Sequence, residues 1–186
     1  LCNRAGGFLS RSEKSRANQF MRLWGKFWSI TMYEYSCKIV RVVDGDTVDV
    51  DIDLGFGMWM HKERIRLYGI DTPESRTRDS TEKKFGYLAK DMIESFLPVG
   101  SIQTLVTVKD KAGKFGRILG KFKIHDGKED RQTTINEWMI ENHYAVAYHG
   151  QSKESIADEH LINYEKVIEH VDLTEDELSL YINSRS

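Results

Sequence analysis

The sequence predicts an α+β fold that is mainly β: a five-stranded barrel combined with three helices. Two observations predict it. Five runs of β-favouring residues recur along the chain, and one strongly amphipathic helix falls between the third run and the fourth. A length of 186 residues suits one domain with a sizeable core and is short for two. With 40% apolar and 30% charged residues and no run of about 20 apolar residues, we expect a soluble protein without membrane contact.

The first three runs predict consecutive strands. Residues 39–43 are β-rich and end at Asp44-Gly45. Apolar residues then alternate strictly with polar ones from Thr47 to Leu54, as in a strand with one solvated face. A turn at Gly55-Phe56-Gly57 leads into a third run over residues 58–70. Three strands in direct succession indicate a meander.

The predicted helix follows a polar loop over residues 72–81. Its apolar residues recur at helical spacing and end before Pro98 and Gly100: Phe85, Leu88, Ala89, Met92, Ile93 and Phe96. Residues 102–108 and 117–124 predict the fourth and fifth strands. Five strands with a helix inserted after the third is the order of an OB-type barrel.

Two more helices are predicted near the end of the chain. Thr134 and Glu137 form a capping box for a helix through Glu141, and Ser155 with Asp158 marks a third helix that runs to about His170.

Charge divides the chain into three parts. Residues 1–31 hold six basic side chains and one acidic side chain, whereas residues 151–186 hold three basic and nine acidic ones. We therefore expect a basic, disordered tail over 1–31, a folded domain over 32–172 and an acidic, frayed tail over 173–186. The first tail could instead be a non-native upstream extension, with the true start at Met21 or Met32. Its polar interruptions exclude a secretory signal but leave open an organelle transit peptide.

The cysteines and histidines predict no metal site. Cys2 and Cys37 lack the paired spacing of zinc ligands and are expected to be free thiols. The six histidines are scattered without ligand spacing.

Residues that could take part in catalysis or binding cluster where the predicted strands begin or end. Asp44-Gly45-Asp46-Thr47-Val48 lies at the first turn, Arg66 to Glu74 (RLYGIDTPE) closes the third strand, and Lys114-Phe115-Gly116-Arg117 opens the fifth. In order and spacing, these motifs and the intervening helix resemble the staphylococcal nuclease (thermonuclease) family over roughly residues 37–149. The resemblance implies the OB-fold barrel of that family and metal-dependent hydrolysis of nucleic acid.

The resemblance implies a calcium site. In the family, the positions of Asp46, Asp71 and the Thr72 carbonyl bind Ca²⁺. Calcium takes several oxygen ligands, and a barrel can bring carboxylates at its strand ends together. Pro73 favours an extended backbone at Thr72, which can turn this carbonyl towards the same ion.

The resemblance also assigns three catalytic residues. Glu74 follows Asp71 closely enough to orient and deprotonate a water molecule. Arg66 and Arg117 correspond to the two arginines that clamp the phosphate, a task suited to a permanently charged, bidentate donor.

Substrate contacts match the family less well. Lys114, Phe115 and Tyr148 occupy positions that contact a terminal phosphate or a nucleotide ring in the family. Phe115 replaces a usual tyrosine, and Gly150 replaces a second aromatic residue. The segment over residues 51–63 is longer than in compact members, which reshapes one rim of the cleft.

Two rival functions fit the sequence less well than the nuclease does. A non-catalytic barrel that binds nucleic acid or a protein partner would be expected to lose some of the five catalytic and metal-binding side chains, and this chain retains all five. An aspartate-nucleophile phosphatase would match Asp44-x-Asp46-x-Val48, but it requires alternating strands and helices and a later acidic pair. A helix-loop-helix calcium site around Asp49 to Asp53 lacks the required glycine and glutamate, since Leu54 and Met60 stand there.

We therefore expect a calcium-dependent endonuclease. Water would attack phosphorus in line on DNA, with RNA as a second candidate substrate, and the products would carry 3′-phosphates if the family's regiochemistry holds. We expect a monomer located in the cytoplasm, with an organelle as the alternative.

Overall fold

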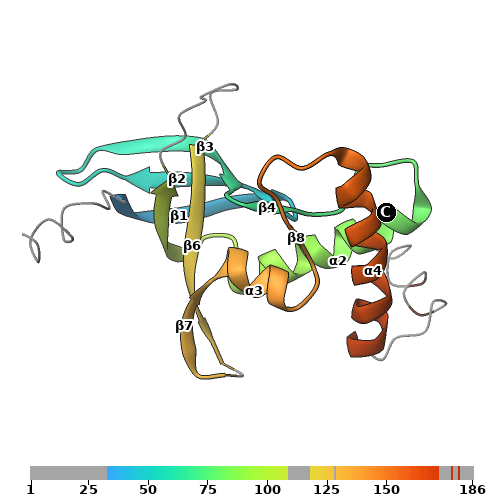
Figure 1. Cartoon of the computed structure of the whole chain (residues 1–186). Helices are drawn as coiled ribbons and strands as arrows, with labels where there is room; N and C mark the ends of the chain where they lie inside the picture. Colours follow the sequence, from blue (N-terminus) through green and yellow to red (C-terminus); the bar gives the residue numbers. More distant parts are fainter. Residues whose placement is uncertain (1–32, 109–117, 128, 172–176, 178–179, 181–186) are drawn as a thin grey trace, which may run out of the picture. The chain divides into compact units, whose positions relative to one another are not determined.

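A computed structural model describes residues 33–108, 118–127, 129–171, 177 and 180 of the chain. Five strands form a closed barrel in which the neighbours run in the order β3-β2-β1-β5-β6 and a parallel pairing of β3 with β6 closes the ring (Figure 1). The barrel strands are β1 (Tyr33–Asp44), β2 (Thr47–Asp53), β3 (Trp59–Leu67), β5 (Ile102–Val108) and β6 (Ile118–Asp126).

Three helices and three short strands complete the described part of the chain. The helices are α2 (Ser80–Phe96), α3 (Ile135–Glu141) and α4 (Lys153–Val171), and the short strands are β4 (Ile70–Asp71), β7 (Arg131–Thr134) and β8 (Val146–Ala147). The predicted α+β, mainly β fold with an OB-type barrel and three helices is confirmed. Across the described residues, no helix combines the length and the apolar character that a membrane span requires.

Local capping explains where the helices begin. The Asp79 carboxylate accepts hydrogen bonds from the backbone N–H groups of Thr81 and Glu82, so α2 begins at Ser80. Thr134 caps α3 as predicted, since its hydroxyl accepts from the N–H of Glu137 at 3.3 Å. For α4 the predicted start at Ser155 was wrong by two residues. The helix begins at Lys153 because the Ser152 hydroxyl, not that of Ser155, serves as the acceptor for the first turn.

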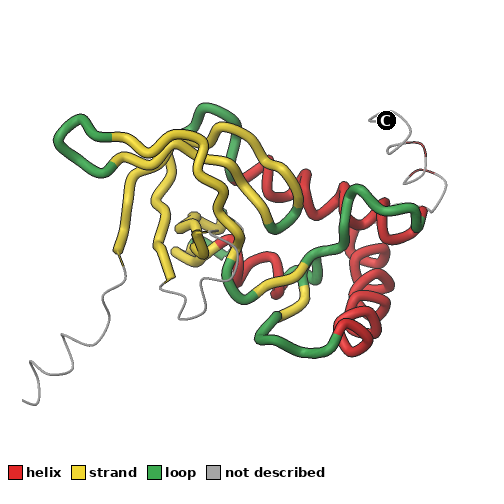
Figure 2. The backbone as a smooth tube through the Cα atoms, turned by 90° about the horizontal axis from the view of Figure 1, so that it is seen from above, coloured by secondary structure: helices red, strands yellow, loops and turns green. Residues whose placement is uncertain are grey.

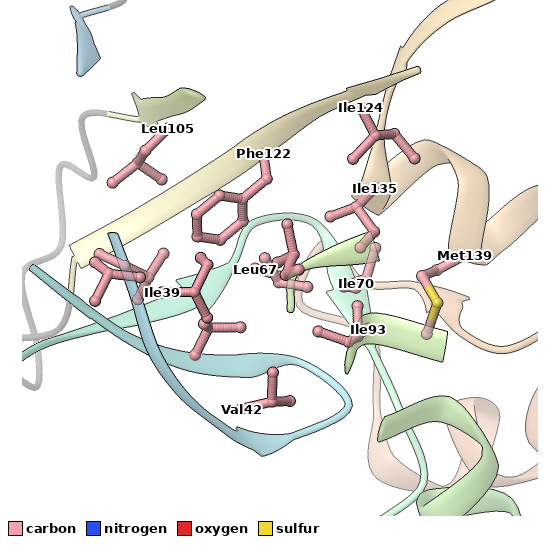
Figure 3. Close-up of a cluster of buried hydrophobic side chains, with 14 of the residues drawn as sticks. Ile39, Val42, Leu67, Ile70, Ile93, Leu105, Phe122, Ile124, Ile135 and Met139 are labelled. Carbon is pink, nitrogen blue, oxygen red and sulfur yellow. The ribbon is translucent and has the colours of Figure 1, made fainter. Parts of the chain in front are cut away.

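The apolar core fills the barrel and continues beneath two helices (Figure 3). Strand alternation directs Val48, Val50 and Ile52 inward, and all three are buried. Ile93 of α2 and Met139 of α3 are fully buried against the same cluster. This packing fixes α2 and α3 against the barrel, and the loops that carry the candidate site lie next to them.

Candidate active site

The turn between β1 and β2 carries the first candidate ligand. Asp46 is buried, with 6% of its surface exposed, and its Oδ1 accepts a hydrogen bond of 2.7 Å from the Thr47 hydroxyl. Asp44 in the same turn accepts from the backbone N–H of Gly45 at 3.0 Å and from that of Ser75 at 3.4 Å. The turn is therefore tied to the loop that follows β4.

Arg66, near the end of β3, joins the two candidate metal ligands. Its Nη1 lies 2.7 Å from Oδ2 of Asp46, and its Nη2 lies 3.2 Å from Oδ1 of Asp71. The register explains this contact, because Arg66 pairs with Thr47, the residue after Asp46. One guanidinium thus holds two carboxylates that are 25 positions apart in the sequence.

Two glycines allow the close packing of the loop over residues 72–75. A Cβ atom on Gly45 would lie 2.8 Å from the Thr72 hydroxyl oxygen, so this position lets the β1–β2 turn pack directly on the loop. A Cβ atom on Gly86 of α2 would lie 2.6 Å from the backbone of Glu74 and Ser75. Helix α2 therefore supports the main chain beneath the candidate base.

Gly86→Ala is expected to destabilise the fold and to displace Glu74. Alanine normally favours a helix interior by about 1 kcal/mol over glycine, but here its methyl group would overlap backbone atoms. Such overpacking costs about 1–3 kcal/mol, so the clash outweighs the helical gain. Urea unfolding would measure the loss. Gly127→Ala is the matched control, because its Cβ would meet nothing within 4 Å; equal stability of Gly86→Ala and wild type would contradict this account.

The site concentrates negative charge. Burial raises the pKa of Asp46 above its ordinary value, and the neighbouring Arg66 opposes that shift. Burial also raises the pKa of Glu74, and the carboxylates of Asp44, Asp46 and Asp71 raise it further. Four acidic side chains therefore interact within one site.

A cavity of about 520 Å³ opens beside this cluster. Arg66, Asp71, Thr72 and Glu74 line one part of it. The start of α2, including Glu82, and the segment after β8, including Tyr148 and His160, line the other parts. Pairing of β4 with β8 and a hydrogen bond of 2.8 Å from the Tyr148 N–H to the Gly69 carbonyl bring these distant segments together. The predicted substrate residue Tyr148 thus lies on the same cavity as Arg66 and Glu74, two of the predicted catalytic residues.

His160 of α4 also belongs to the site, although no sequence pattern predicts it. Its Nε2 lies 3.3 Å from Oδ2 of Asp71, and the residue is 8% exposed. An ionised carboxylate only accepts hydrogen bonds, so Nε2 must carry the proton in this contact. Tyr164 anchors the helix by stacking on Phe85 of α2, with ring centroids 3.8 Å apart. Both oxygens of Asp71 are therefore held, one by Arg66 and the other by His160.

The donor set at the site fits a hard divalent cation. Within the described ranges, no three His, Cys, Asp or Glu side chains are arranged as a metal-ligand group. The predicted set contains two carboxylates and one main-chain carbonyl, so water and substrate oxygens would complete the shell that calcium prefers. The surplus of carboxylates over positive charge favours such an ion.

Three predicted residues lie outside the described residues. They are Lys114 and Phe115, assigned to substrate contacts, and Arg117, assigned to phosphate. The two predicted tails, residues 1–31 and 173–186, also fall outside this part of the chain, except for residues 177 and 180. Ile118, the first residue of β6, pairs with Ile65 next to Arg66.

Fold and site together define a small OB-type barrel protein with a carboxylate and arginine cluster at the ends of its strands. The sequence model of the staphylococcal nuclease homologue family matches residues 64–170, and the chain belongs to this family.

Curated relatives agree with this assignment. The chain is 31% identical to a thermonuclease of Staphylococcus hyicus over 54% of this chain and 57% of the relative. It is 29% identical to a micrococcal nuclease of Shigella flexneri over 72% and 68% of the two chains. It is 31% identical to an uncharacterized protein of Methanocaldococcus jannaschii over 63% and 61%. The match spans roughly three fifths to two thirds of the length of the first relatives. Family and relatives support a nuclease function in general terms.

Proposed function

We propose that this protein is a calcium-dependent endonuclease that hydrolyses DNA, with RNA as a second substrate. The observation that carries the proposal is the bridge from Arg66 to both Asp46 and Asp71, which places the predicted arginine and the two predicted metal ligands in one site. The rival, a non-catalytic binding barrel, offers no reason to bury Asp46 and hold both oxygens of Asp71 in place.

The roles follow from the positions of the groups. Asp46, Asp71 and the Thr72 carbonyl would hold the ion. When bound, Ca²⁺ supplies positive charge that polarises the phosphodiester. Glu74 lines the same cavity, where it can orient a water molecule and accept its proton. Arg66 and Arg117 would donate to the non-bridging oxygens as their charge grows in the transition state.

Tyr148 and the residues preceding Arg117 would handle the substrate. Tyr148 lines the cavity, and its ring could stack on a base, a contact that is largely independent of base sequence. Lys114 would contact a terminal phosphate, and Phe115 would pack without the hydroxyl contact of a tyrosine. Water attack in line with the 5′ oxygen would leave 3′-phosphates. A monomeric state and a cytoplasmic location stay predictions.

Removing calcium is expected to abolish cleavage of denatured DNA. Addition of a chelator should stop the reaction, and excess Ca²⁺ should restore it. Without a divalent cation between them, the carboxylates would repel the negatively charged phosphate. Gel analysis of single- and double-stranded DNA and RNA, with the metal varied, tests both the ion and the substrate class. Undiminished cleavage in chelator would remove the metal from the mechanism.

His160→Ala is expected to weaken calcium binding about 10- to 100-fold, the usual effect of losing a side chain that orients a metal ligand. Calorimetric titration with Ca²⁺ measures this directly, without turnover. His160→Gln keeps an N–H donor and should recover part of the affinity. His125→Ala is the matched control, since His125 contacts Asp130 on the exposed surface. Wild-type affinity in His160→Ala would show that His160 does not orient Asp71.

A further inference from the structure

The outer face of β3 carries aromatic and basic side chains in line with Arg66. Arg64 is exposed and alternates with the buried Ile65, so it points away from the core. Further along, the rings of Trp59 and His61 stack with centroids 6.5 Å apart and planes inclined by 13°. We name Trp59, His61 and Arg64 the outer track of β3.

The strand register shows that the outer track is continuous with the candidate site. On the neighbouring β2, Asp53, Asp49 and Thr47 pair with Trp59, Arg64 and Arg66 in turn. A bulge at Lys62, with a φ of 57°, shifts the register and allows His61 to reach Asp51 on the same face. From Arg66 to Trp59 the strand covers roughly 20 Å. The hairpin tip projects from the barrel in Figure 2.

The acidic residues on this face, Asp49, Asp51 and Asp53, all accept hydrogen bonds within the hairpin or from β1. Asp49 accepts two hydrogen bonds of 2.8 Å: Arg64 Nε donates to its Oδ1, and Arg41 Nη2 donates to its Oδ2. Two guanidinium groups thus share one carboxylate, and the side chains of Arg41 and Arg64 remain 59% and 49% exposed, respectively. Asp51 accepts from the Lys62 N–H at 2.8 Å. The face therefore retains outward cationic donors beside flat aromatic rings.

We propose that the outer track of β3 is an extended binding site for a single-stranded stretch of nucleic acid whose scissile phosphate lies at Arg66. Bases stack on Trp59 and His61, and Arg64 and Arg41 contact the backbone. Aromatic stacking together with basic groups is the usual means of binding single strands, and OB-type barrels use the face of their second and third strands for it. The inference rests on the proposed nuclease function, and it assigns a role to the long β2–β3 hairpin.

Binding as a function of oligonucleotide length tests the proposal. The full chain in chelator would be titrated into labelled oligothymidylate of about 12 nucleotides and into a dinucleotide, with anisotropy as the signal. Trp59→Ala should raise the Kd for the longer strand about 5- to 100-fold, and the loss should grow with length. Arg41→Gln should lower the slope of log affinity against log salt by about 0.7.

Phe56→Ser is the matched control, because it removes a fully exposed aromatic residue from the turn of the same hairpin. It should bind the longer strand as wild type does, and thermal unfolding would confirm that each variant is folded. Wild-type affinity in Trp59→Ala would overturn the proposal and leave the aromatic pair to a protein partner or a lipid surface. Cleavage is scored separately in Ca²⁺: absence of cleavage with Trp59-dependent binding would sink only the nuclease function.

Discussion

Glu74→Gln should lower kcat for DNA hydrolysis by about 10²- to 10⁴-fold, the usual contribution of a general base. Glutamine keeps the size and polarity of the side chain but cannot accept a proton. The carboxylate of Glu74 interacts with Asp44, Asp46 and Asp71, so neutralising it also relieves repulsion. The fold should therefore be at least as stable as wild type. Single-turnover rates with denatured DNA, together with thermal unfolding, measure both effects.

Glu82→Gln is the control for this substitution. Glu82 lies in the first turn of α2 and lines the same cavity. The control therefore makes the same Glu-to-Gln change on this cavity, but at a residue without a predicted catalytic role. It should leave kcat close to the wild-type value. A wild-type rate in Glu74→Gln would exclude Glu74 as the base. An equal loss in both variants would show that the cavity needs negative charge in general and not a specific proton acceptor.

Arg117→Ala should lower kcat by about 10²- to 10³-fold, as expected for removal of one donor to transition-state charge. The loss should appear in kcat more than in KM, because the charge on the non-bridging oxygens grows only as the reaction proceeds. Arg117→Lys keeps the charge but loses the bidentate fork, so it should recover only part of the rate. Steady-state kinetics on one defined oligonucleotide separate the two parameters.

Arg78→Ala provides the matched control, since Arg78 is an exposed arginine of the loop before α2. A rise in KM with unchanged kcat in Arg117→Ala would reassign Arg117 to ground-state binding. Arg66 would then be the sole phosphate clamp among the predicted residues.

Long periodic segments made most of the fold predictable. The alternation in β2 and the helical spacing in α2 each extend over enough residues to reveal which face is buried. Strands β4, β7 and β8 have two to four residues, which is too short for a period. The third predicted run extended to Ile70, but none of the three was predicted as a separate strand. Yet β4 and β8 bring Asp71 next to the segment that carries Tyr148.

The candidate site was predictable where its residues sit at strand ends. Asp46, Arg66 and Asp71 follow or close neighbouring strands, and the barrel brings them together. His160 was missed because its contact with Asp71 spans 89 positions and depends on where α4 packs. That packing depends on contacts such as the stacking of Tyr164 on Phe85. No pattern in the sequence predicts that these two residues are in contact.

The bridge formed by Arg66 has a consequence for the metal-free protein. Because the guanidinium already serves as the counter-ion of Asp46 and Asp71, the barrel does not need a divalent ion to hold its acidic groups together. Under the proposed function, folding and metal binding would then be separate events, unlike in small zinc domains that fold only around their metal. The proposed calcium ion and nucleic-acid strand would then bind to a site that is already assembled.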